Sequence, residues 1–227
     1  MLRLLCLIDT DDRNFYFQSA LRRLKMEFPD EICGECFSPM AVRMDKTKHA
    51  ALMKAADACD FAVVYFHGGC GNLPDFTEFW KRVTSHARCF FQSSLPEEIA
   101  ELMPASRLAP SEYQTLNDYF FRATEENCFN MLLWIAHGLF GVGKPALPYE
   151  EIPQAGLYVG GEISGAEAEK DYLRQACETK NPVIGMLIHR SYIQSGNTSA
   201  VDALIAALEK QGAFVLPEIG RASCRER

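Results

Sequence analysis

Two histidines could take part in chemistry because each one ends a run of apolar residues. His67 follows residues 61–66, and His189 follows residues 183–188. An imidazole can coordinate a metal ion or transfer a proton near neutral pH. We therefore take His67 and His189 as candidates for a ligand site. The alternative for each is a structural histidine held by hydrogen bonds within the fold.

The residues before His67 predict a strand that is buried on both faces. Residues 61–66 are all apolar or aromatic, include β-branched Val63 and Val64, and are too few for a stable helix. Gly68 and Gly69 follow, and glycine adopts the positive φ angles of a tight turn without strain. Ligands commonly bind where a parallel strand ends in such a loop.

Cys33 and Cys36 have the spacing of a zinc or redox pair. The sequence contains no second CxxC pair that would complete a four-cysteine zinc site. If residues 32–37 form a strand, side-chain alternation points the two thiols to opposite faces. We therefore interpret them as core or turn cysteines.

Three carboxylates follow the first apolar segment, at Asp9, Asp11 and Asp12. Carboxylates at the end of a strand can hold a hard cation such as Mg²⁺. We favour a simpler interpretation, in which they form the solvated first turn of a helix and are stabilised by its dipole.

Residues 138–145 approach the pattern of a phosphate-binding loop. Pro145 stands where that motif needs a hydroxyl for magnesium, and the segment follows a helical pattern instead of a strand. The glycines are better explained as a helix end, and we expect no ATP site here.

Strand and helix patterns alternate over residues 1–95. Strands are predicted at residues 2–8, 31–37, 61–66 and 88–91, and helices at residues 13–27, from residue 45 onwards and at residues 75–86. This alternation predicts an α/β domain with a flavodoxin-like parallel sheet flanked by helices.

The rest of the chain is expected to contain a long helix, a linker and the start of a second α/β unit. Apolar residues predict a helical segment over residues 96–140, which packs on the first domain and bends near Ala123 and Thr124. Residues 141–181 are predicted to be a linker, extended as far as residue 161, and then a polar helix.

A βαβ unit is predicted over residues 182–220, with a second buried strand at residues 183–188. A unit this small cannot bury both of its faces alone, so we expect an incomplete domain that continues further. Residues 221–227 break the pattern and are interpreted as a non-native tail.

Composition limits the possible functions. A net charge of −7 disfavours nucleic acid and anionic membranes as partners. The nine cysteines are an odd number, and the chain has neither a secretory signal nor a membrane-spanning apolar stretch. We expect a reduced, cytoplasmic protein.

Four segments, read together, resemble the amino-terminal part of the large subunit of cobaltochelatase (CobN type) and its relative, the magnesium chelatase H subunit. They are residues 55–69, with the strand and glycine loop; residues 119–138, with Asn127 and Asn130; residues 153–158, PQAGLY; and residues 182–217, which match the family pattern over their whole length. The last segment is the most distinctive.

The resemblance implies a module that binds a tetrapyrrole and takes part in inserting cobalt or magnesium. The metal would be a substrate ion, no cofactor would be tightly bound, and ATP would be hydrolysed on separate AAA-type partner subunits. The remainder of the large subunit would be a further partner. The resemblance is thus to part of an ATP-dependent ligase, and the chain alone would be inactive.

On this interpretation the ligand would lie near two strand ends. The expected contacts are His67, Gly68, Gly69, Tyr158, His189 and Arg190. The two imidazoles would ligate the metal or move protons from pyrrole nitrogens, and Arg190 would pair with a peripheral carboxylate or amide.

Two alternatives remain open. The chain could be a scaffold or docking domain with no ligand of its own, in which the histidines are structural. It could also be a flavodoxin-like binder of a small ligand at the loop after His67.

Overall fold

The computed structural model describes residues 1–151, 153, 155–194 and 196–220. The chain forms two compact units, of which the first spans Met1–Glu150 and the second begins at Glu151. In the described residues, none of the helices is both long enough and apolar enough to cross a membrane.

The first unit is built on a four-stranded parallel sheet in the order β2-β1-β3-β4. Its strands are β1 (Leu2–Ile8), β2 (Ile32–Phe37), β3 (Phe61–Phe66) and β4 (Arg88–Ser93). The sheet has the first four positions of the flavodoxin-like order. The α/β class with a helix-flanked parallel sheet is therefore confirmed.

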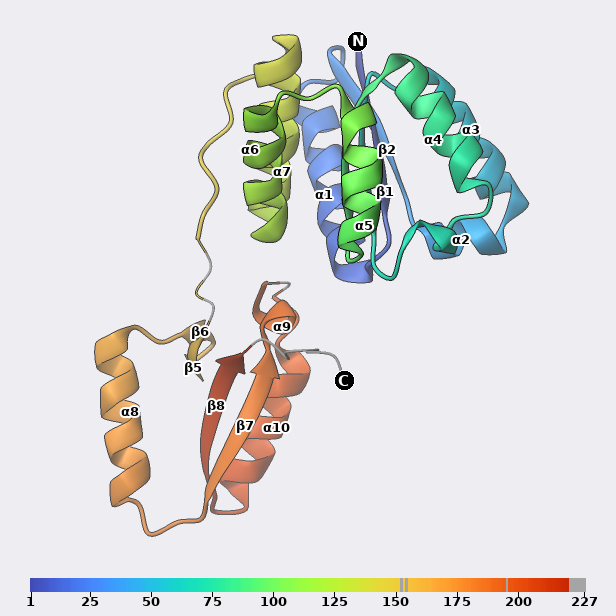
Figure 1. Ribbon diagram of the computed structural model, residues 1–227. Coiled ribbons are helices and arrows are strands. Elements are labelled where there is room, and N and C mark those ends of the chain that lie inside the picture. Colours follow the sequence, from blue (N-terminus) through green and yellow to red (C-terminus); the bar gives the residue numbers. More distant parts are fainter. Residues whose placement is uncertain (152, 154, 195, 221–227) are drawn as a thin grey trace. The chain divides into compact units, whose positions relative to one another are not determined.

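Helices cover both faces of this sheet (Figure 1). They are α1 (Asp11–Glu27), α2 (Pro39–Met44), α3 (Lys46–Ala58), η1 (Cys70–Asn72), α4 (Phe76–His86), α5 (Pro96–Leu102), η2 (Met103–Ser106), α6 (Pro110–Phe121), α7 (Glu125–Leu133) and the π-helix η3 (Trp134–Leu139). Thus the segment after residue 95 contributes α6 and α7 to the layer that contains α1, and α5 and η2 to the opposite layer.

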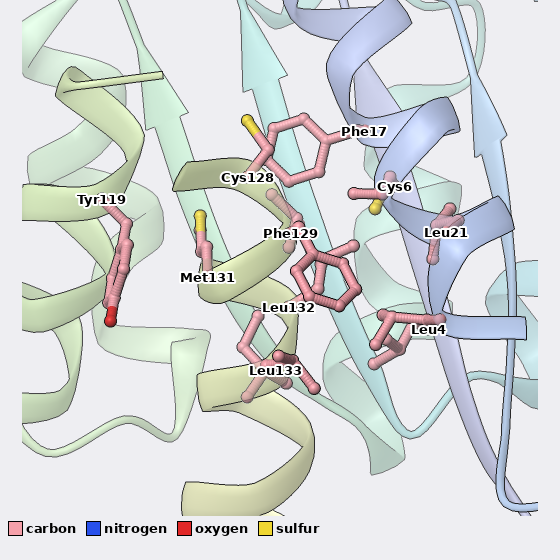
Figure 2. Packing of buried hydrophobic residues seen from close by; sticks show 14 of the residues in the cluster. Leu4, Cys6, Phe17, Leu21, Tyr119, Cys128, Phe129, Met131, Leu132 and Leu133 are labelled. Atoms are coloured by element: carbon pink, nitrogen blue, oxygen red, sulfur yellow. The ribbon is translucent and has the colours of Figure 1, made fainter. Parts of the chain in front are cut away.

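Side-chain alternation in β1 divides the core into two layers. Leu4 and Cys6 face α1, α6 and α7, where Phe17 and Phe129 fill the space (Figure 2). Leu5 and Leu7 face the opposite layer, which contains α3 and α4. All residues of β3 are buried, as expected for a central parallel strand.

The long helix expected within residues 96–140 is not continuous. It ends at Phe121 and restarts at Glu125, where the Thr124 side chain accepts a hydrogen bond from the Asn127 N–H and caps α7. The break lies at the predicted bend, because a threonine cap can begin a new helix there and so turn the chain.

Two buried asparagines bind the extended segment after η3 to α7. Asn127 donates to the Glu150 carbonyl at 2.9 Å and accepts from the Glu150 N–H at 2.9 Å. Asn130 accepts from the Leu147 N–H at 2.9 Å. Residues 146–150, which the sequence suggested were linker, are therefore fixed to the first unit.

The second unit contains a mixed sheet in the order β6-β5-β8-β7, in which β7 and β8 are parallel and β5 is antiparallel to β8. Its elements are β5 (Gly156–Val159), β6 (Glu162–Ile163), α8 (Ala166–Glu178), β7 (Val183–His189), α9 (Arg190–Gln194), α10 (Ser199–Lys210) and β8 (Phe214–Gly220). The expectation of an extended linker up to residue 161 is wrong, because β5 and β6 form a hairpin in this sheet.

β7 is buried on one face only, which corrects the expectation of a fully buried strand. Ile188 is 3% exposed and belongs to a small cluster with Tyr158 and Ile219. Leu187, on the other face, is 68% exposed. An apolar run alone does not distinguish a strand with one covered face from a strand with two.

Candidate functional site

The carboxyl ends of β1 and β3 lie side by side, and the strand order of the first sheet reverses between these two strands. The Asp9 carboxylate, just after β1, accepts a hydrogen bond from the His67 N–H at 2.9 Å. It also accepts one from Asn72 Nδ2 at 3.1 Å. This junction is the expected location of a ligand site in an open α/β sheet.

The glycine loop is held by hydrogen bonds to two side chains that follow β4, those of Ser94 and of Glu98 in α5. The Gly68 N–H donates to Ser94 Oγ at 2.8 Å, and the Cys70 N–H donates to Glu98 Oε1 at 2.9 Å. Gly69 has a φ of 98°, and a Cβ there would lie 2.8 Å from Leu95 Cδ1. Only glycine satisfies both the backbone angle and the close contact.

These contacts determine which ligands suit the loop. The N–H groups of His67, Gly68 and Cys70 already donate to protein oxygens, two of which belong to the carboxylates of Asp9 and Glu98. A phosphate group would find these donors occupied and would face like charge. The geometry therefore disfavours a flavin or nucleotide bound by its phosphate here.

Burial opposes the charge on Glu98 and by itself would raise the pKa of this carboxyl. Hydrogen bonds from Ser93, from the Cys70 N–H and from the Cys70 thiol outweigh this effect and lower the pKa of Glu98 below its usual value. Burial, reinforced by the hydrogen bond to Glu98, raises the pKa of the Cys70 thiol to about 11. The Cys70 thiol is therefore protonated at neutral pH and unsuited to nucleophilic catalysis.

Glu98→Gln should remove part of the acid sensitivity of the first unit. A carboxyl whose pKa is lowered by folding stabilises the fold above its unfolded pKa, and this contribution disappears as pH falls through the folded pKa. We expect the variant to be about 1 kcal/mol less stable at pH 7. This difference should shrink towards about pH 3 in thermal melts. Glu97→Gln, the exposed neighbour, should show no such convergence, and parallel curves for Glu98→Gln would contradict the assignment.

The imidazole of His67 is exposed, and its Nδ1 lies 3.5 Å from the Tyr65 hydroxyl, at the limit of a hydrogen bond. Gly68 beside it is exposed and Gly69 is buried. Of the predicted loop contacts, His67 and Gly68 are thus available to a ligand, whereas Gly69 shapes the turn.

His189 ends β7 in the second unit, and its hydrogen bonds determine its tautomer. The Ser191 N–H donates to His189 Nδ1 at 3.2 Å, and Ser191 Oγ lies 2.7 Å from the same nitrogen. In the neutral ring Nδ1 is therefore the acceptor, and the hydrogen is on Nε2. The exposed ring then offers an N–H donor, which suits a carboxylate or amide oxygen better than a metal ion.

The other two predicted contacts of the second unit lie inside it. Arg190 is 7% exposed and Tyr158 is 3% exposed. The Tyr158 hydroxyl donates to Asp202 Oδ1 at 2.8 Å and so connects β5 to the first turn of α10. Burial, with the Asp202 hydrogen bond, raises the pKa of Tyr158. Tyr158 therefore has a structural role in this arrangement.

The remaining motifs do not form sites. Cys33 and Cys36 lie on opposite faces of β2, as predicted, since Cys36 packs in the α1 layer and Cys33 lines a groove beside α3. Within the part of the chain that the structure describes, no three His, Cys, Asp or Glu side chains are grouped to hold a metal ion. Lys144 of the apparent phosphate loop pairs with Glu27 at 2.6 Å.

Sequence reasoning did not identify the residues that hold the loop. Asp9 was considered only as part of an acidic group, and Ser94 and Glu98 belong to no local motif. Their contacts with the loop cross 58, 26 and 28 residues of sequence. The only available signal was their position after predicted strands of a parallel sheet.

Comparisons with known proteins agree with this fold. The model of the family CobN/Magnesium Chelatase matches residues 117–226. A curated relative, the aerobic cobaltochelatase subunit CobN of a Sinorhizobium species, is 30% identical over 121 residues, which are 51% of this chain and 9% of the relative.

A solved structure, the catalytic subunit of cobaltochelatase from Mycobacterium tuberculosis, matches all of the chain and 17% of its own length, with a TM-score of 0.58 and 18% identity. The structural match supports the fold, and the two sequence matches support a relationship to the chelatase family. Together, the sequence matches show that residues 117–226, slightly less than half of this chain, are similar to the CobN/magnesium chelatase family.

Proposed function

We propose that the chain is a tetrapyrrole-binding module of a metal-chelatase large subunit. The observation that carries the proposal is the family match over residues 117–226, which includes the strand that His189 ends. Tetrapyrroles carry carboxylate or amide groups at their edge. The exposed Nε2–H of His189 and the exposed imidazole of His67 are suitable donors for such groups.

The metal would reach the macrocycle as a substrate of the whole subunit. Cobalt is named in both relatives, and magnesium in the family description. ATP would be hydrolysed by AAA-type partner subunits, and no tightly bound cofactor would be needed in this module. The proposed role here is to hold the edge of the macrocycle while other parts of the subunit act on its centre.

A spectroscopic titration tests this role. We expect protoporphyrin and hydrogenobyrinic acid diamide to show a saturable spectral change with the chain. Replacing His189 by Ala should weaken binding about tenfold, because a hydrogen bond to a charged group contributes about 1.5–3 kcal/mol. His67→Ala should weaken it to a similar extent. His86→Ala, an exposed histidine at the end of α4, should bind like the unchanged chain.

A scaffold role is the second candidate, and a specific observation favours it. The donors of the glycine loop and the Tyr158 hydroxyl are satisfied within the protein. A scaffold would give no spectral change with either macrocycle at high micromolar concentration. If the three histidine variants bound the macrocycle with equal affinity, the macrocycle would bind away from the proposed contacts.

A further inference from the structure

The edge of the first sheet at β2 has a different character from the edge at β4. β4 is covered: the Tyr113 hydroxyl donates to the Phe91 carbonyl at 2.6 Å, and η2 brings the Arg107 carbonyl to Arg88 Nε at 3.2 Å. β2 pairs with β1 on one side and with no other strand in the described residues. An open strand edge presents unpaired N–H and C=O groups to a partner.

Grooves lie on both faces of the β2 edge. A groove of about 500 Å³ on the α3 side is bordered by Cys33, Gly34 and Ala55. A second groove, of about 380 Å³, lies between β2 and α1. Lys25 and Gly34 line both, so the two grooves adjoin at the strand edge. An added strand places alternate side chains on opposite faces, one set in each groove.

Gly34 leaves the space beside the β2 edge free of a side chain. A Cβ at this position would lie 2.5 Å from Leu21 Cδ2 and 2.9 Å from the Leu4 carbonyl oxygen. β2 and α1 therefore approach each other closely at this point, and a side chain cannot fill the space above the strand. The absence of a side chain exposes the β2 backbone beside both grooves.

The charges around the edge select the kind of partner. Arg3, Lys25 and Lys54 line the larger groove, and Arg22 lines the smaller one. None of these four side chains forms an ion pair with a described residue, although the chain as a whole carries a net charge of −7. Glu35 is the single acidic side chain that lines either groove. A second copy would bring the same cations to the edge, so charge repulsion disfavours pairing of β2 with itself.

We propose that the β2 edge is a docking site for an extended acidic peptide segment of a partner protein, which adds a strand beside β2. Its backbone pairs with the β2 edge, its small or apolar side chains enter one groove, and its carboxylates meet the cations. β2 has six residues, so an added segment of similar length covers it. The residues that line this site include none of the tetrapyrrole contacts proposed above.

The test uses the whole chain and a fluorescein-labelled peptide of ten residues in which Glu and Val alternate. Fluorescence anisotropy should show saturable binding that weakens with added salt. Reversing Arg3, Lys25 and Lys54 to Glu should weaken binding at least tenfold. A matched control reverses Lys46, Lys81 and Lys180, which are equally exposed and lie outside both grooves. This control should bind like the unchanged chain.

Two peptides methylated on alternate backbone nitrogens separate strand pairing from simple charge attraction. In one, the methyl groups block the peptide edge that faces β2, and in the other they block the opposite edge. We expect one peptide to bind like the unmodified peptide and the other to lose binding. Equal binding of both, or an unchanged affinity after the first triple reversal, would overturn the proposal. Thermal melts of each variant establish that it is folded.

Discussion

Ile188→Asp should unfold the second unit while leaving the first unit intact. The variant places a carboxylate in the small cluster that Ile188 forms with Tyr158 and Ile219. Burial of an unpaired charge, with the loss of the isoleucine side chain, should cost at least about 4 kcal/mol. The two core clusters of the first unit contain no residue of the second unit, so they should persist.

Hydrogen exchange resolved by peptide is the suitable measurement. Amides of β7, β8 and α10 should lose protection in the variant, and amides of β1 and β3 should keep theirs. Leu187→Asp is the matched control at the neighbouring position, because that side chain is 68% exposed. It should change stability by about 0.5 kcal/mol or less. Equal loss of protection in both variants would contradict the assignment of Ile188 to the buried face of β7 and Leu187 to its exposed face.

Asn127→Ala should destabilise the first unit by about 3 kcal/mol. Asn127 has no exposed surface, and its side chain forms three hydrogen bonds: to the Arg122 carbonyl, to the Glu150 carbonyl and from the Glu150 N–H. Truncation leaves these backbone groups unsatisfied, which is costly where water is excluded. The thermal midpoint should fall by about 10 °C.

Asn127→Asp tests whether the amide group of Asn127, and not only the size of its side chain, stabilises the first unit. It retains an acceptor for the Glu150 N–H but places a carboxylate against two carbonyl oxygens, so it should be at least as destabilising as alanine. Gln114→Ala removes an exposed side chain of α6 and should change the midpoint little. An aspartate variant as stable as the unchanged chain would contradict the hydrogen bonding described for Asn127.

The sequence was a good guide to the first sheet because its pattern is local. β3 is a continuous apolar run that is preceded by Asp60 and followed by His67 and two glycines, and the alternation of strands and helices leaves few possible topologies. The segment after residue 140 was harder to interpret. Its sequence predicted a linker, whereas Asn127 and Asn130 hold part of it to α7 through long-range hydrogen bonds that no local pattern indicates.

The candidate site was predictable in position and less so in chemistry. A glycine loop after a buried strand indicated where to look, and His67 and Gly68 are exposed there. The occupation of the loop donors by Asp9 and Glu98 depends on which strands are neighbours. For the same reason, the sequence could not show that Tyr158 bonds to Asp202 across the second unit.

The most direct test of a tetrapyrrole-binding role is to locate the bound macrocycle by hydrogen exchange of the whole chain with and without protoporphyrin at saturation. We predict new protection in the loop at residues 67–70 and at the end of β7 around residues 189–191, with little change at the β2 edge. A saturable spectral change without protection at either loop would contradict the proposed contacts. The absence of any spectral change or protection would contradict the binding role itself.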